Sequence, residues 1–381
     1  MSIQLKLKPI IGVDARPLSY GYTGNSRYLI EALKYLVRKD SHFEYRLYSN
    51  KEIHPVFLPT LEELKLTLSP IKKFPGILWL NFILPGLLSA ENVDIFWGTL
   101  QLLPLFKLPL PTVVNYHDLN FISAPETMSY PNFIQHKLLS SFTLNHADRI
   151  FCLSENTKNE ISEFKPDIAE KLTVIYPGAN RITEKENDSG TKDFILTIST
   201  IEPRKNLRTL IDGYLDVVSH NSEYPYKLVI AGRIGWGEES LVNSLKNGAY
   251  SNKGIIFIEN PDEGTLAFLL RNCKFFLFPS KHEGFGLPII EAIVEGKLCI
   301  TSDIPVFREI IEPTYDLLAE TLNVKSWSSK IIEMTERVSK IKSRNIKNGK
   351  WSWLSTGKLI ESEITNVWDS YIKEKTMSHA I

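Results

Sequence analysis

The sequence predicts an α/β protein with a doubly wound, Rossmann-like architecture in two halves. Short apolar runs alternate with helical patterns along most of the chain, and several of these runs, such as IFCL, LVIA and FFLF, are apolar at every position. Such runs are typical of strands covered on both faces in parallel sheets. Strand–helix alternation sustained over this length is typical of doubly wound folds. A chain of 381 residues has room for two domains.

The expected elements follow these runs in chain order. In the first half, strands are predicted at Pro9–Val13, Glu44–Tyr48, Val93–Trp97, Thr112–Tyr116, Arg149–Leu153 and Thr173–Ile175. In the second half, they are predicted at Asp193–Ser199, Lys227–Ala231, Gly254–Ile258, Lys274–Phe278 and Leu298–Thr301. Helices expected between them include Ser26–Val37, Asn132–Ala147, Glu155–Phe164, Leu207–Val218, Gly264–Cys273 and Pro288–Gly296, and the tail Trp351–Ile372 has a helical stripe.

A polar, charged stretch at Arg181–Thr191 interrupts the alternation. We interpret residues 181–192 as a linker between an N-terminal domain (1–180) and a C-terminal domain (193–355). We expect the helical tail, residues 356–381, to be able to pack back on the N-terminal domain. The alternative, a long surface loop within one domain, stays open at this point.

The composition is that of a globular protein without a global electric field. Apolar residues make up 43% and charged residues 23%, which argues against disordered, collagen-like and coiled-coil classes. Lys and Arg together number 44, as do Asp and Glu, so the net charge is zero. We therefore expect no nucleic-acid partner, although a local basic pocket for a small anion is compatible with this balance.

The cysteines and the apolar stretches indicate a location. Cys152, Cys273 and Cys299 are odd in number and widely spaced, which favours buried free thiols in a reducing compartment. The N-terminus has no apolar stretch as long as that of a signal peptide. The longest apolar stretch, Ile77–Ala90, is shorter than the roughly 20 residues that span a bilayer. We expect a cytoplasmic protein, with the inner face of a membrane as the alternative.

The segment 274–296, KFFLFPSKHEGFGLPIIEAIVEG, combines a strand, a loop with two glycines and a helix start. Pro288 suits the first helical position because it lacks the N–H that would be unpaired there. Gly284 and Gly286 allow the backbone to approach a ligand closely. The N–H groups at the helix start and the helix dipole together favour an anion.

Two glutamates flank this predicted anion site. Glu283 precedes it, and Glu291 lies in the first turns of the helix. A phosphate bound at the helix start would therefore have a carboxylate on either side. A nucleotide sugar, with its sugar, diphosphate and ribose in series, has that layout.

A second loop, Glu202–Asn206, follows the strand FILTIS and precedes a helix. Its two adjacent cations, Arg204 and Lys205, suit a diphosphate, since Arg offers a planar fork and Lys a compact charge. From the residues alone, a solvated basic turn is the simpler interpretation.

The first half contributes two further candidates. Gly21 and Gly24 lie in a loop between the first strand and a helix that begins near Asn25, and this loop suits a phosphate. His117-Asp118 directly follows a predicted strand, where open α/β sheets place ligand groups.

The string E-G-F-G-L-P-I-I-E at Glu283–Glu291 resembles the E-x7-E motif of retaining glycosyltransferases of family four, which have the GT-B fold. The likeness extends back through Phe278-Pro279-Ser280 and forward through residues 302–310. The E-P-R-K-N stretch at Glu202–Asn206 is similar to the family's at the expected distance, and this favours the phosphate role over the solvated turn. Gly232-Arg233 and Gly235-Trp236-Gly237 resemble bacterial mannosyltransferase-like members.

The resemblance implies two Rossmann-like domains that face each other across a cleft, with the donor held mainly by the second and the acceptor by the first. It implies catalytic roles for Glu283, His117, Arg204 and Lys205. The donor-binding residues it implies are Gly24, Glu202, Arg204, Lys205, Glu283, Gly284, Phe285, Gly286, Leu287 and Glu291. It also implies acceptor contacts for Asp118 and Arg27, and no requirement for a metal or other cofactor.

The expected reaction is transfer of a sugar, with mannose from GDP-mannose as the first candidate, to a glycan or lipid-linked glycan acceptor with retention of configuration. The expected pathway is bacterial surface polysaccharide synthesis, such as O-antigen, lipopolysaccharide or capsule. Ser199-Thr200 departs from the family, which commonly has Gly, often followed by Arg, at this place, so the phosphate role falls more heavily on Arg204 and Lys205. After Ile310 the resemblance weakens.

Three alternatives are weighed against this hypothesis. A sugar-nucleotide epimerase of GT-B-like fold would not need the pair of motifs, and a non-catalytic nucleotide-sugar binding subunit would not need Glu283, Lys205 and His117 together. A nicotinamide oxidoreductase would need G-x-G-x-x-G after the first strand, which is absent. Separately, the apolar stretch Ile77–Leu88 after Lys72-Lys73 allows either peripheral contact with the inner membrane or a buried helix and loop.

Overall fold

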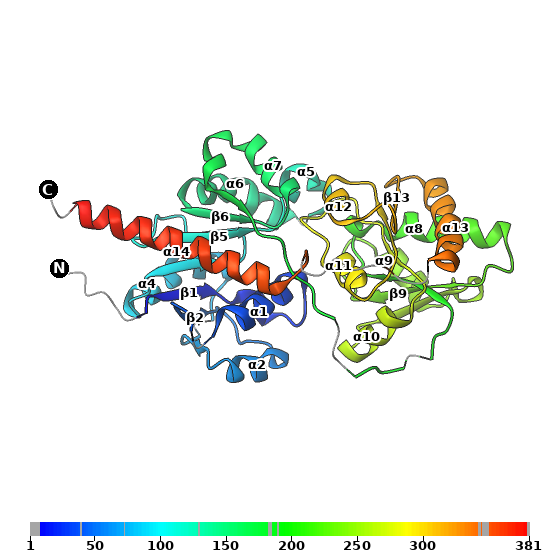
Figure 1. Cartoon of the computed structure of the whole chain (residues 1–381), viewed down its shortest axis with the longest axis horizontal. Helices are drawn as coiled ribbons and strands as arrows, with labels where there is room; N and C mark the ends of the chain where they lie inside the picture. Colours follow the sequence, from blue (N-terminus) through cyan, green and yellow to red (C-terminus); the bar gives the residue numbers. More distant parts are fainter. Residues whose placement is uncertain are drawn as a thin grey trace. The chain divides into compact units, whose positions relative to one another are not determined.

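The computed structural model describes residues 8–38, 40–71, 73–128, 130–181, 185–188, 190–341, 344 and 350–378. The chain divides into two compact units (Figure 1). The first unit combines Met1–Phe121, Ser129–Gly178 and Trp351–Ile381, and the second combines Ile122–Met128 and Ala179–Lys350. The sequence-based limits, at residues 180 and 355, differ from these by a few residues, and the short excursion Ile122–Met128 was not predicted.

Seven parallel strands form the sheet of the first unit, in the order β3-β2-β1-β4-β5-β6-β7. The strands are β1 Ile10–Asp14, β2 Glu44–Tyr48, β3 Thr67–Leu68, β4 Ile95–Gly98, β5 Thr112–Tyr116, β6 Arg149–Cys152 and β7 Leu172–Val174. The interior strand β5 is buried at all five residues, as expected for a parallel strand covered on both faces. In the register, Val114 pairs with Gly98 on one side and Ile150 on the other.

Six parallel strands form the sheet of the second unit, in the order β10-β9-β8-β11-β12-β13. The strands are β8 Phe194–Ile198, β9 Lys227–Gly232, β10 Ile255–Glu259, β11 Phe276–Phe278, β12 Cys299–Ser302 and β13 Leu317–Ala319. Counted in chain order within each unit, both sheets begin 3-2-1-4-5-6, which is the Rossmann order. The predicted fold class, two Rossmann-like α/β sheets, is confirmed.

Helices connect these strands. In the first unit they are η1 Arg16–Ser19, α1 Gly24–Leu36, η2 Pro55–Phe57, α2 Leu58–Glu63, α3 Gly76–Leu78, η3 Trp79–Ile83, α4 Leu84–Ala90, α6 Tyr130–His146, α7 Glu155–Phe164, η5 Pro166–Lys171 and α14 Trp353–Ser378. In the second they are η4 Pro125–Thr127, η6 Pro203–Lys205, α8 Leu207–His220, α9 Glu239–Lys246, η7 Ser251–Lys253, α10 Glu263–Asn272, α11 Leu287–Val294, α12 Pro305–Ile310 and α13 Val324–Lys340. The short α5 Asn120–Ser123 lies where the chain passes between the units.

The core of the second unit shows why α8 forms where it does. Its buried residues Leu207, Leu210, Ile211, Tyr214 and Val217 recur at helical spacing and give one apolar face. Helix α13 packs against this helix, and a Cβ built on Gly213 would lie 2.7 Å from the Cβ of Trp327. Glycine at this position therefore permits the close approach of the two helices, which lie side by side in Figure 1.

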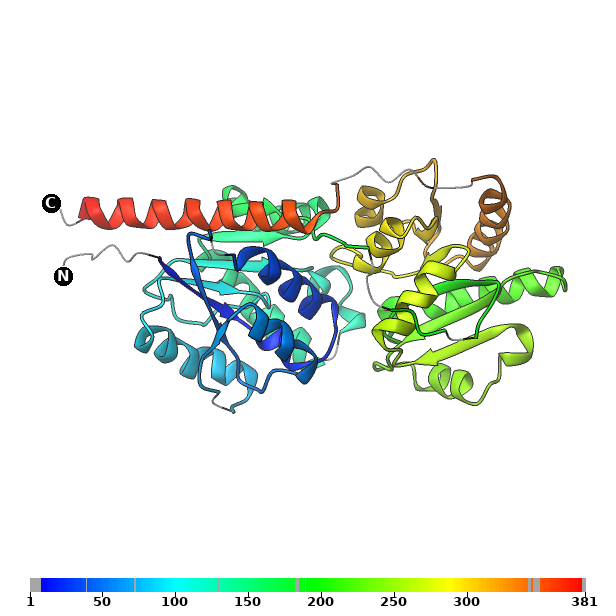
Figure 2. The ribbon, with the colours of Figure 1, turned by 60° about the horizontal axis from the view of Figure 1, so that its bottom comes forward.

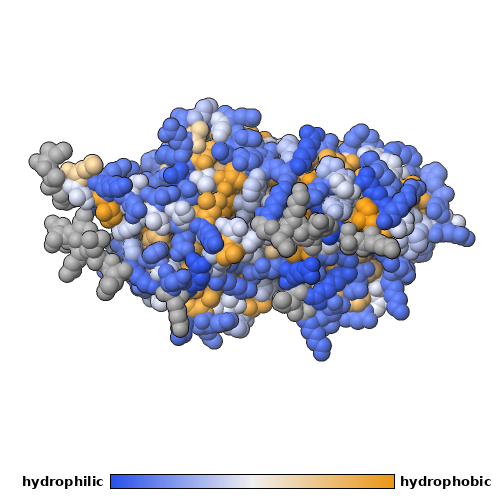
Figure 3. Space-filling view, viewed as in Figure 1, coloured by the Kyte–Doolittle hydropathy of each residue, from blue (hydrophilic) through white to orange (hydrophobic). Residues whose placement is uncertain are grey.

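The stretch Ile77–Leu88 is a helical segment composed of α3, the π-helical turn η3 and α4. Trp79, Leu80, Leu84 and Leu88 are buried, so one face of the segment serves the core, while Leu78 and Phe82 are exposed. Lys72 lies outside the described residues. In the part of the chain that the structure describes, no helix combines the length and apolarity needed to cross a bilayer. The face shown in Figure 3 is largely hydrophilic, with apolar areas over both units.

Helix α14 belongs to the first unit and is anchored there by polar contacts along its length. Glu361 pairs with Arg38 at 2.9 Å, and Glu363 pairs with Arg149 at 3.0 Å. Nearer its start, the Thr356 hydroxyl donates to the Tyr176 carbonyl at 2.7 Å. Figures 1 and 2 show the helix extending along this unit.

We predict that Gly357→Ala destabilises the first unit. A Cβ at Gly357 would lie 1.8 Å from Cδ1 of Tyr35 on α1, and the ring has little freedom to move because Arg38 lies 4.3 Å from its centroid. Overpacking of this kind costs about 1–3 kcal/mol, which exceeds the gain from replacing a helical glycine. Urea unfolding should show a lower midpoint for Gly357→Ala. The exposed Ser355→Ala on the same helix is the control, and equal midpoints for both variants would contradict the prediction.

Candidate functional site

The sheet order of the second unit brings two predicted loops together. Strands β8 and β11 are neighbours at the point where the strand order reverses, and ligands of open α/β sheets bind beyond the carboxyl ends of such strands. The loops that leave these ends are residues 199–206 and 279–286. Among the hydrogen bonds that join them, Asn206 Nδ2 donates to the Pro279 carbonyl at 3.1 Å, and the Lys281 amide donates to the Arg204 carbonyl at 2.9 Å.

A buried charge cluster lies where the two loops meet. The Glu283 carboxylate accepts from Arg204 Nη1 at 2.5 Å through one oxygen and from Lys205 Nζ through the other. Arg204 also binds Glu202 at 2.8 Å and the His282 carbonyl at 3.0 Å. All four side chains are less than one-fifth exposed. Two carboxylates and two cations thus neutralise one another in a largely desolvated place.

The charges at this cluster shift the pKa values of its members. Burial raises the pKa of Glu283, but the adjacent Arg204 and Lys205 outweigh it and lower that pKa to about 2. Burial, together with repulsion from Arg204, lowers the pKa of Lys205, and Glu283 opposes this shift. The carboxylate of Glu283 therefore stays ionised throughout the neutral range.

Backbone conformation supports the placement of the cations. Asn206 adopts the left-handed conformation at φ 52° and ψ 34°, immediately before α8. Its side chain is held by Pro279 and by the Thr321 carbonyl at 2.7 Å, so the strained residue is fixed from two sides. The Lys205 ammonium lies 5.1 Å from the ring centroid of Phe278 at the end of β11, a cation–π distance.

The helix predicted to bind an anion begins one residue earlier than expected. Helix α11 starts at Leu287, so Pro288 is its second residue. Gly286 precedes it at φ 135°, a conformation that a side chain rarely adopts. A Cβ there would also lie 3.0 Å from Ile289 and 3.2 Å from Phe307. Gly284 and Phe285 are buried in this loop, and Glu291 lies in the second turn of the helix, partly buried.

In the first unit, the glycine loop is closed by a capping box. Helix α1 begins at Gly24, and the Thr23 hydroxyl accepts from the Ser26 amide at 3.2 Å while Ser26 Oγ accepts from the Thr23 amide at 2.7 Å. One of the N–H donors expected for a ligand, that of Ser26, is therefore already paired. The Arg27 guanidinium lies 5.4 Å from the ring centroid of Tyr22.

His117 is held in one orientation at the end of β5. Its Nε2 lies 2.8 Å from the Thr99 carbonyl, and its ring lies edge-on to that of Tyr28 with centroids 6.2 Å apart. Burial lowers the pKa of His117, so the ring is neutral at neutral pH. Because a carbonyl only accepts, Nε2 carries the proton, and Nδ1 is left as a hydrogen-bond acceptor.

Asp118 is positioned by Gln101, which the sequence analysis did not identify. Gln101 follows β4 with φ 51°, and its side-chain amide donates to the Asp118 carbonyl oxygen at 3.0 Å. The Asp118 carboxylate also accepts from the side-chain amide of Asn120 at 2.7 Å. Gln101 carries no sequence signal, because neither its left-handed backbone nor its partner can be read from the local pattern.

A second unpredicted pair lies at the end of β1, on the same edge. The carboxylate of Asp14 is fully buried and accepts from Arg16 at 2.7 Å and 2.9 Å. The Thr99 hydroxyl donates to the Asp14 carbonyl at 2.5 Å. Thr99 therefore links Asp14 to His117. A polar residue that closes an apolar strand, as in VDAR, is the signal that could have indicated Asp14.

Among the residues that the structure describes, no cluster of three or more His, Cys, Asp or Glu side chains could hold a metal ion. The cysteines Cys152, Cys273 and Cys299 are buried and unpaired with one another.

Models of known protein families match both units of the chain. Residues 22–181 match the family model described as Glycosyltransferase Family 4, and residues 179–351 match the model described as Glycosyl transferases group 1. The chain belongs to the GT-B glycosyltransferases. The two family models meet at residues 179–181, close to the point where the first unit gives way to the second at Gly178–Ala179.

Relatives and solved structures agree with this family. The chain is 31% identical over 224 residues to the Escherichia coli serotype-specific mannosyltransferase WbdA, covering 55% of this chain but 27% of WbdA, so the match spans about a quarter of that relative. It is 27% identical over 298 residues to the uncharacterized glycosyltransferase MJ1178 of Methanocaldococcus jannaschii, covering 74% and 79%. The crystal structure of Anabaena HepE with UDP and glucose superposes with a TM-score of 0.66 at 17% identity over 97% and 99% of the chains.

We predict that the free energy of unfolding falls less steeply with decreasing pH in Glu283→Gln than in the wild type. The folded-state pKa of Glu283, about 2, lies below its ordinary value of 4.5. Ionised Glu283 therefore stabilises the fold above pH 4.5, and this contribution is lost as the pH falls from 4.5 through 2. Across that window the wild type should lose more free energy of unfolding than Glu283→Gln, by about 3 kcal/mol at most.

Urea unfolding over a pH series measures this difference. The control is Glu238→Gln, which removes a carboxylate from the more exposed ion pair with Arg208. Parallel loss of stability in the wild type and Glu283→Gln would show that Arg204 and Lys205 do not lower the pKa of Glu283.

Proposed function

We propose that this protein is a retaining glycosyltransferase that moves a sugar, in the first instance mannose from GDP-mannose, to a glycan or lipid-linked glycan acceptor. The pathway proposed is bacterial surface polysaccharide synthesis, at the cytoplasmic face of the inner membrane. The observation that carries the proposal is the Glu202–Arg204–Lys205–Glu283 cluster at the carboxyl ends of β8 and β11. Similarity to the mannosyltransferase WbdA supports mannose.

The donor diphosphate would bind Arg204, Lys205 and the amide groups at Phe285–Leu287. Without a ligand, both cations are neutralised by Glu283 and Glu202. An arriving diphosphate competes for the same cations through charge-assisted hydrogen bonds, each contributing about 1.5–3 kcal/mol. As Arg204 and Lys205 turn to the phosphate oxygens, Glu283 is released to contact the sugar, while Glu291 binds the ribose hydroxyls.

Transfer breaks the bond between the anomeric carbon and the phosphate oxygen and forms a bond from that carbon to the acceptor oxygen. Negative charge grows on the departing diphosphate, where Arg204 and Lys205 stabilise it. Ionised Glu283 stabilises positive character at the anomeric carbon. The acceptor hydroxyl loses its proton to the departing phosphate, so that no dedicated protein base is needed and no metal or cofactor takes part.

The first unit would supply groups to the sugar and the acceptor. Neutral His117 would present Nδ1 as an acceptor for a sugar hydroxyl, because Nε2–H is committed to Thr99. Asp118 and Arg27 are proposed to contact the acceptor, and Gly24 to lie beside the donor. Asp118 is held for this role by Gln101 and Asn120.

The donor is tested by measuring thermal shifts with UDP, GDP, TDP and ADP and then transfer from the matching nucleotide sugar. We expect GDP to stabilise the second unit most, GDP-mannose to be consumed, the product to retain the anomeric configuration by NMR, and a chelator to leave the rate unchanged. HepE was solved with UDP. A thermal shift with UDP in place of GDP would therefore change the proposed donor to a UDP-sugar, and the proposed transfer reaction would stand. Binding without turnover would point to a non-catalytic subunit, and isomerisation of the donor without acceptor to an epimerase. No response to any nucleotide would overturn the proposal.

We predict that Lys205→Ala lowers kcat about 10²–10³-fold, because it removes a charge that matters most in the transition state.

Glu283→Ala should abolish transfer while leaving nucleotide binding largely intact. Arg208→Ala breaks a more exposed ion pair of the same unit, with Glu238 at 2.6 Å, and should transfer at the wild-type rate. Unchanged transfer by Glu283→Ala would remove this residue from the mechanism.

A further inference from the structure

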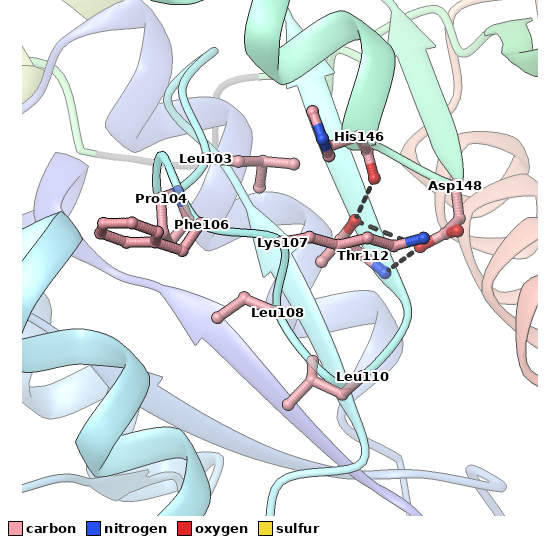
Figure 4. Close-up of a pocket in the computed structure, with 9 residues that line it drawn as sticks. All are labelled: Leu103, Pro104, Phe106, Lys107, Leu108, Leu110, Thr112, His146 and Asp148. Atoms are coloured by element: carbon pink, nitrogen blue, oxygen red, sulfur yellow. Dashed lines mark hydrogen bonds between the residues drawn. The ribbon is translucent and has the colours of Figure 1, made fainter.

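A buried hydroxyl without a partner lies in the loop that carries Glu283. Ser280 is fully buried, and its Oγ makes no hydrogen bond to any residue that the structure describes. Buried hydroxyls are ordinarily satisfied. Thr112, beside the hollow of the first unit in Figure 4, is an example, because its hydroxyl donates to Asp148 at 3.2 Å. An unpaired buried hydroxyl costs free energy, so its place in this loop calls for a physical reason.

The backbone on both sides of Ser280 is fixed. The Pro279 carbonyl accepts from Asn206 Nδ2 at 3.1 Å, and the Lys281 amide donates to the Arg204 carbonyl at 2.9 Å. Rotation about the Cα–Cβ and Cβ–Oγ bonds is the freedom that remains to the hydroxyl. Ser280 therefore stands firmly at the junction of the two loops, where the charge cluster lies, with a hydroxyl that can still turn.

The unpaired hydroxyl acts on the carboxylate of Glu283. Burial raises the pKa of Glu283, whereas Arg204, Lys205 and the Ser280 hydroxyl lower it. The hydroxyl therefore lies close to this carboxylate, but without the geometry of a hydrogen bond. Each carboxylate oxygen already accepts from a cation, one from Arg204 Nη1 at 2.5 Å and the other from Lys205 Nζ. Charge-assisted bonds of this kind are about twice as strong as one from a neutral donor, which explains why the hydroxyl is left over.

We propose that Ser280 is a positioning residue for Glu283, and that its hydroxyl donates to the carboxylate when a cation moves away. Its use in catalysis rests on the proposed function, in which a donor diphosphate draws Arg204 and Lys205 toward the phosphate oxygens. The released carboxylate then lies in a largely desolvated place, where an unpaired charge is costly. The Ser280 hydroxyl is the donor at hand to satisfy and orient it.

A neutral donor suits this task better than a third cation. A hydroxyl fixes the orientation of the Glu283 carboxylate and leaves its negative charge in place. That charge is what the carboxylate would offer to positive character at the anomeric carbon. Arg204 and Lys205, in contrast, cancel the charge for as long as they hold it.

A double-mutant cycle tests the contact without any nucleotide or sugar. The variants of the full chain are Ser280→Ala, Lys205→Ala and the two together, each unfolded in urea. In the wild-type background, Ser280→Ala should leave the midpoint unchanged or raise it, because the hydroxyl that it removes has no partner. In the Lys205→Ala background, it should raise the unfolding equilibrium constant about tenfold, because the hydroxyl then binds the carboxylate oxygen that Lys205 has left.

Ser302→Ala is the matched control for this cycle. Ser302, at the end of β12, is also fully buried with an unpaired Oγ, so its replacement removes the same atoms. It is not among the groups that shift the pKa of Glu283. Its effect on the unfolding equilibrium should therefore be equal in the wild-type and Lys205→Ala backgrounds.

Transfer from the donor gives the second measurement. Ser280→Ala should lower kcat about tenfold or more and leave KM nearly unchanged, since it loses a hydrogen bond to a charged group that forms after the diphosphate has bound. A merely structural role would not separate kcat from KM in this way. If Lys205→Ala does not fold, this measurement decides, and a wild-type kcat for Ser280→Ala would overturn the proposal.

The stability cycle can also fail by itself. Equal effects of Ser280→Ala in both backgrounds, or a coupling with Lys205→Ala that is as large for Ser302→Ala, would show that Ser280 does not take over from the cation. Absence of nucleotide binding and transfer in the wild type would instead overturn the proposed function. The cycle would still report the contact between Ser280 and Glu283, so the two failures are distinguishable.

Discussion

The contact of Glu283 with Arg204 and Lys205 is the interaction on which the candidate site of the second unit depends. It joins two loops that leave neighbouring strands of the second sheet, 78 and 79 residues apart in the chain. Because all the partners are largely desolvated, removing one leaves a buried charge uncompensated, which costs about 3–5 kcal/mol. The loop conformations follow from this requirement. Asn206 adopts a left-handed conformation to place the cations, and Gly286 at φ 135° turns the chain from Glu283 into α11.

The strand order explains why these loops can meet at all. At the reversal between β8 and β11, the connections leave toward opposite faces of the sheet, which leaves room for their loops to meet beyond the strand ends. The first sheet repeats the order, with β1 beside β4, and there Asp14, Thr99 and His117 form a chain of contacts. The reversal of the strand order therefore carries a cluster of four charged side chains in the second unit, and hydrogen bonds through Thr99 in the first unit.

The sequence predicted interior strands such as β5 and β8, and it also predicted the edge strands β7 and β10. The edge strands β3 and β13 were not predicted, because two and three residues are too few to show a strand pattern in the sequence. The candidate residues Arg204, Lys205 and Glu283 were found through their motifs. Their mutual pairing was not, since no local pattern reports a contact between residues 79 positions apart. Gln101 was missed for the same reason: its importance comes from Asp118, which lies on another loop.

The pairing of Arg204 and Lys205 with Glu283 also affects which anions can bind these two cations. A pair of unopposed cations would attract any phosphate, whereas Arg204 and Lys205 in this cluster can be drawn away from Glu283 only by an anion that replaces both contacts together. A diphosphate offers oxygens to both cations, but a single weak anion does not repay the loss of two charge-assisted hydrogen bonds. The sugar attached to that diphosphate then meets the carboxylate that has just been released. In the proposed mechanism, donor binding and the exposure of Glu283 are therefore one event, which keeps the reactive carboxylate paired until a substrate is present.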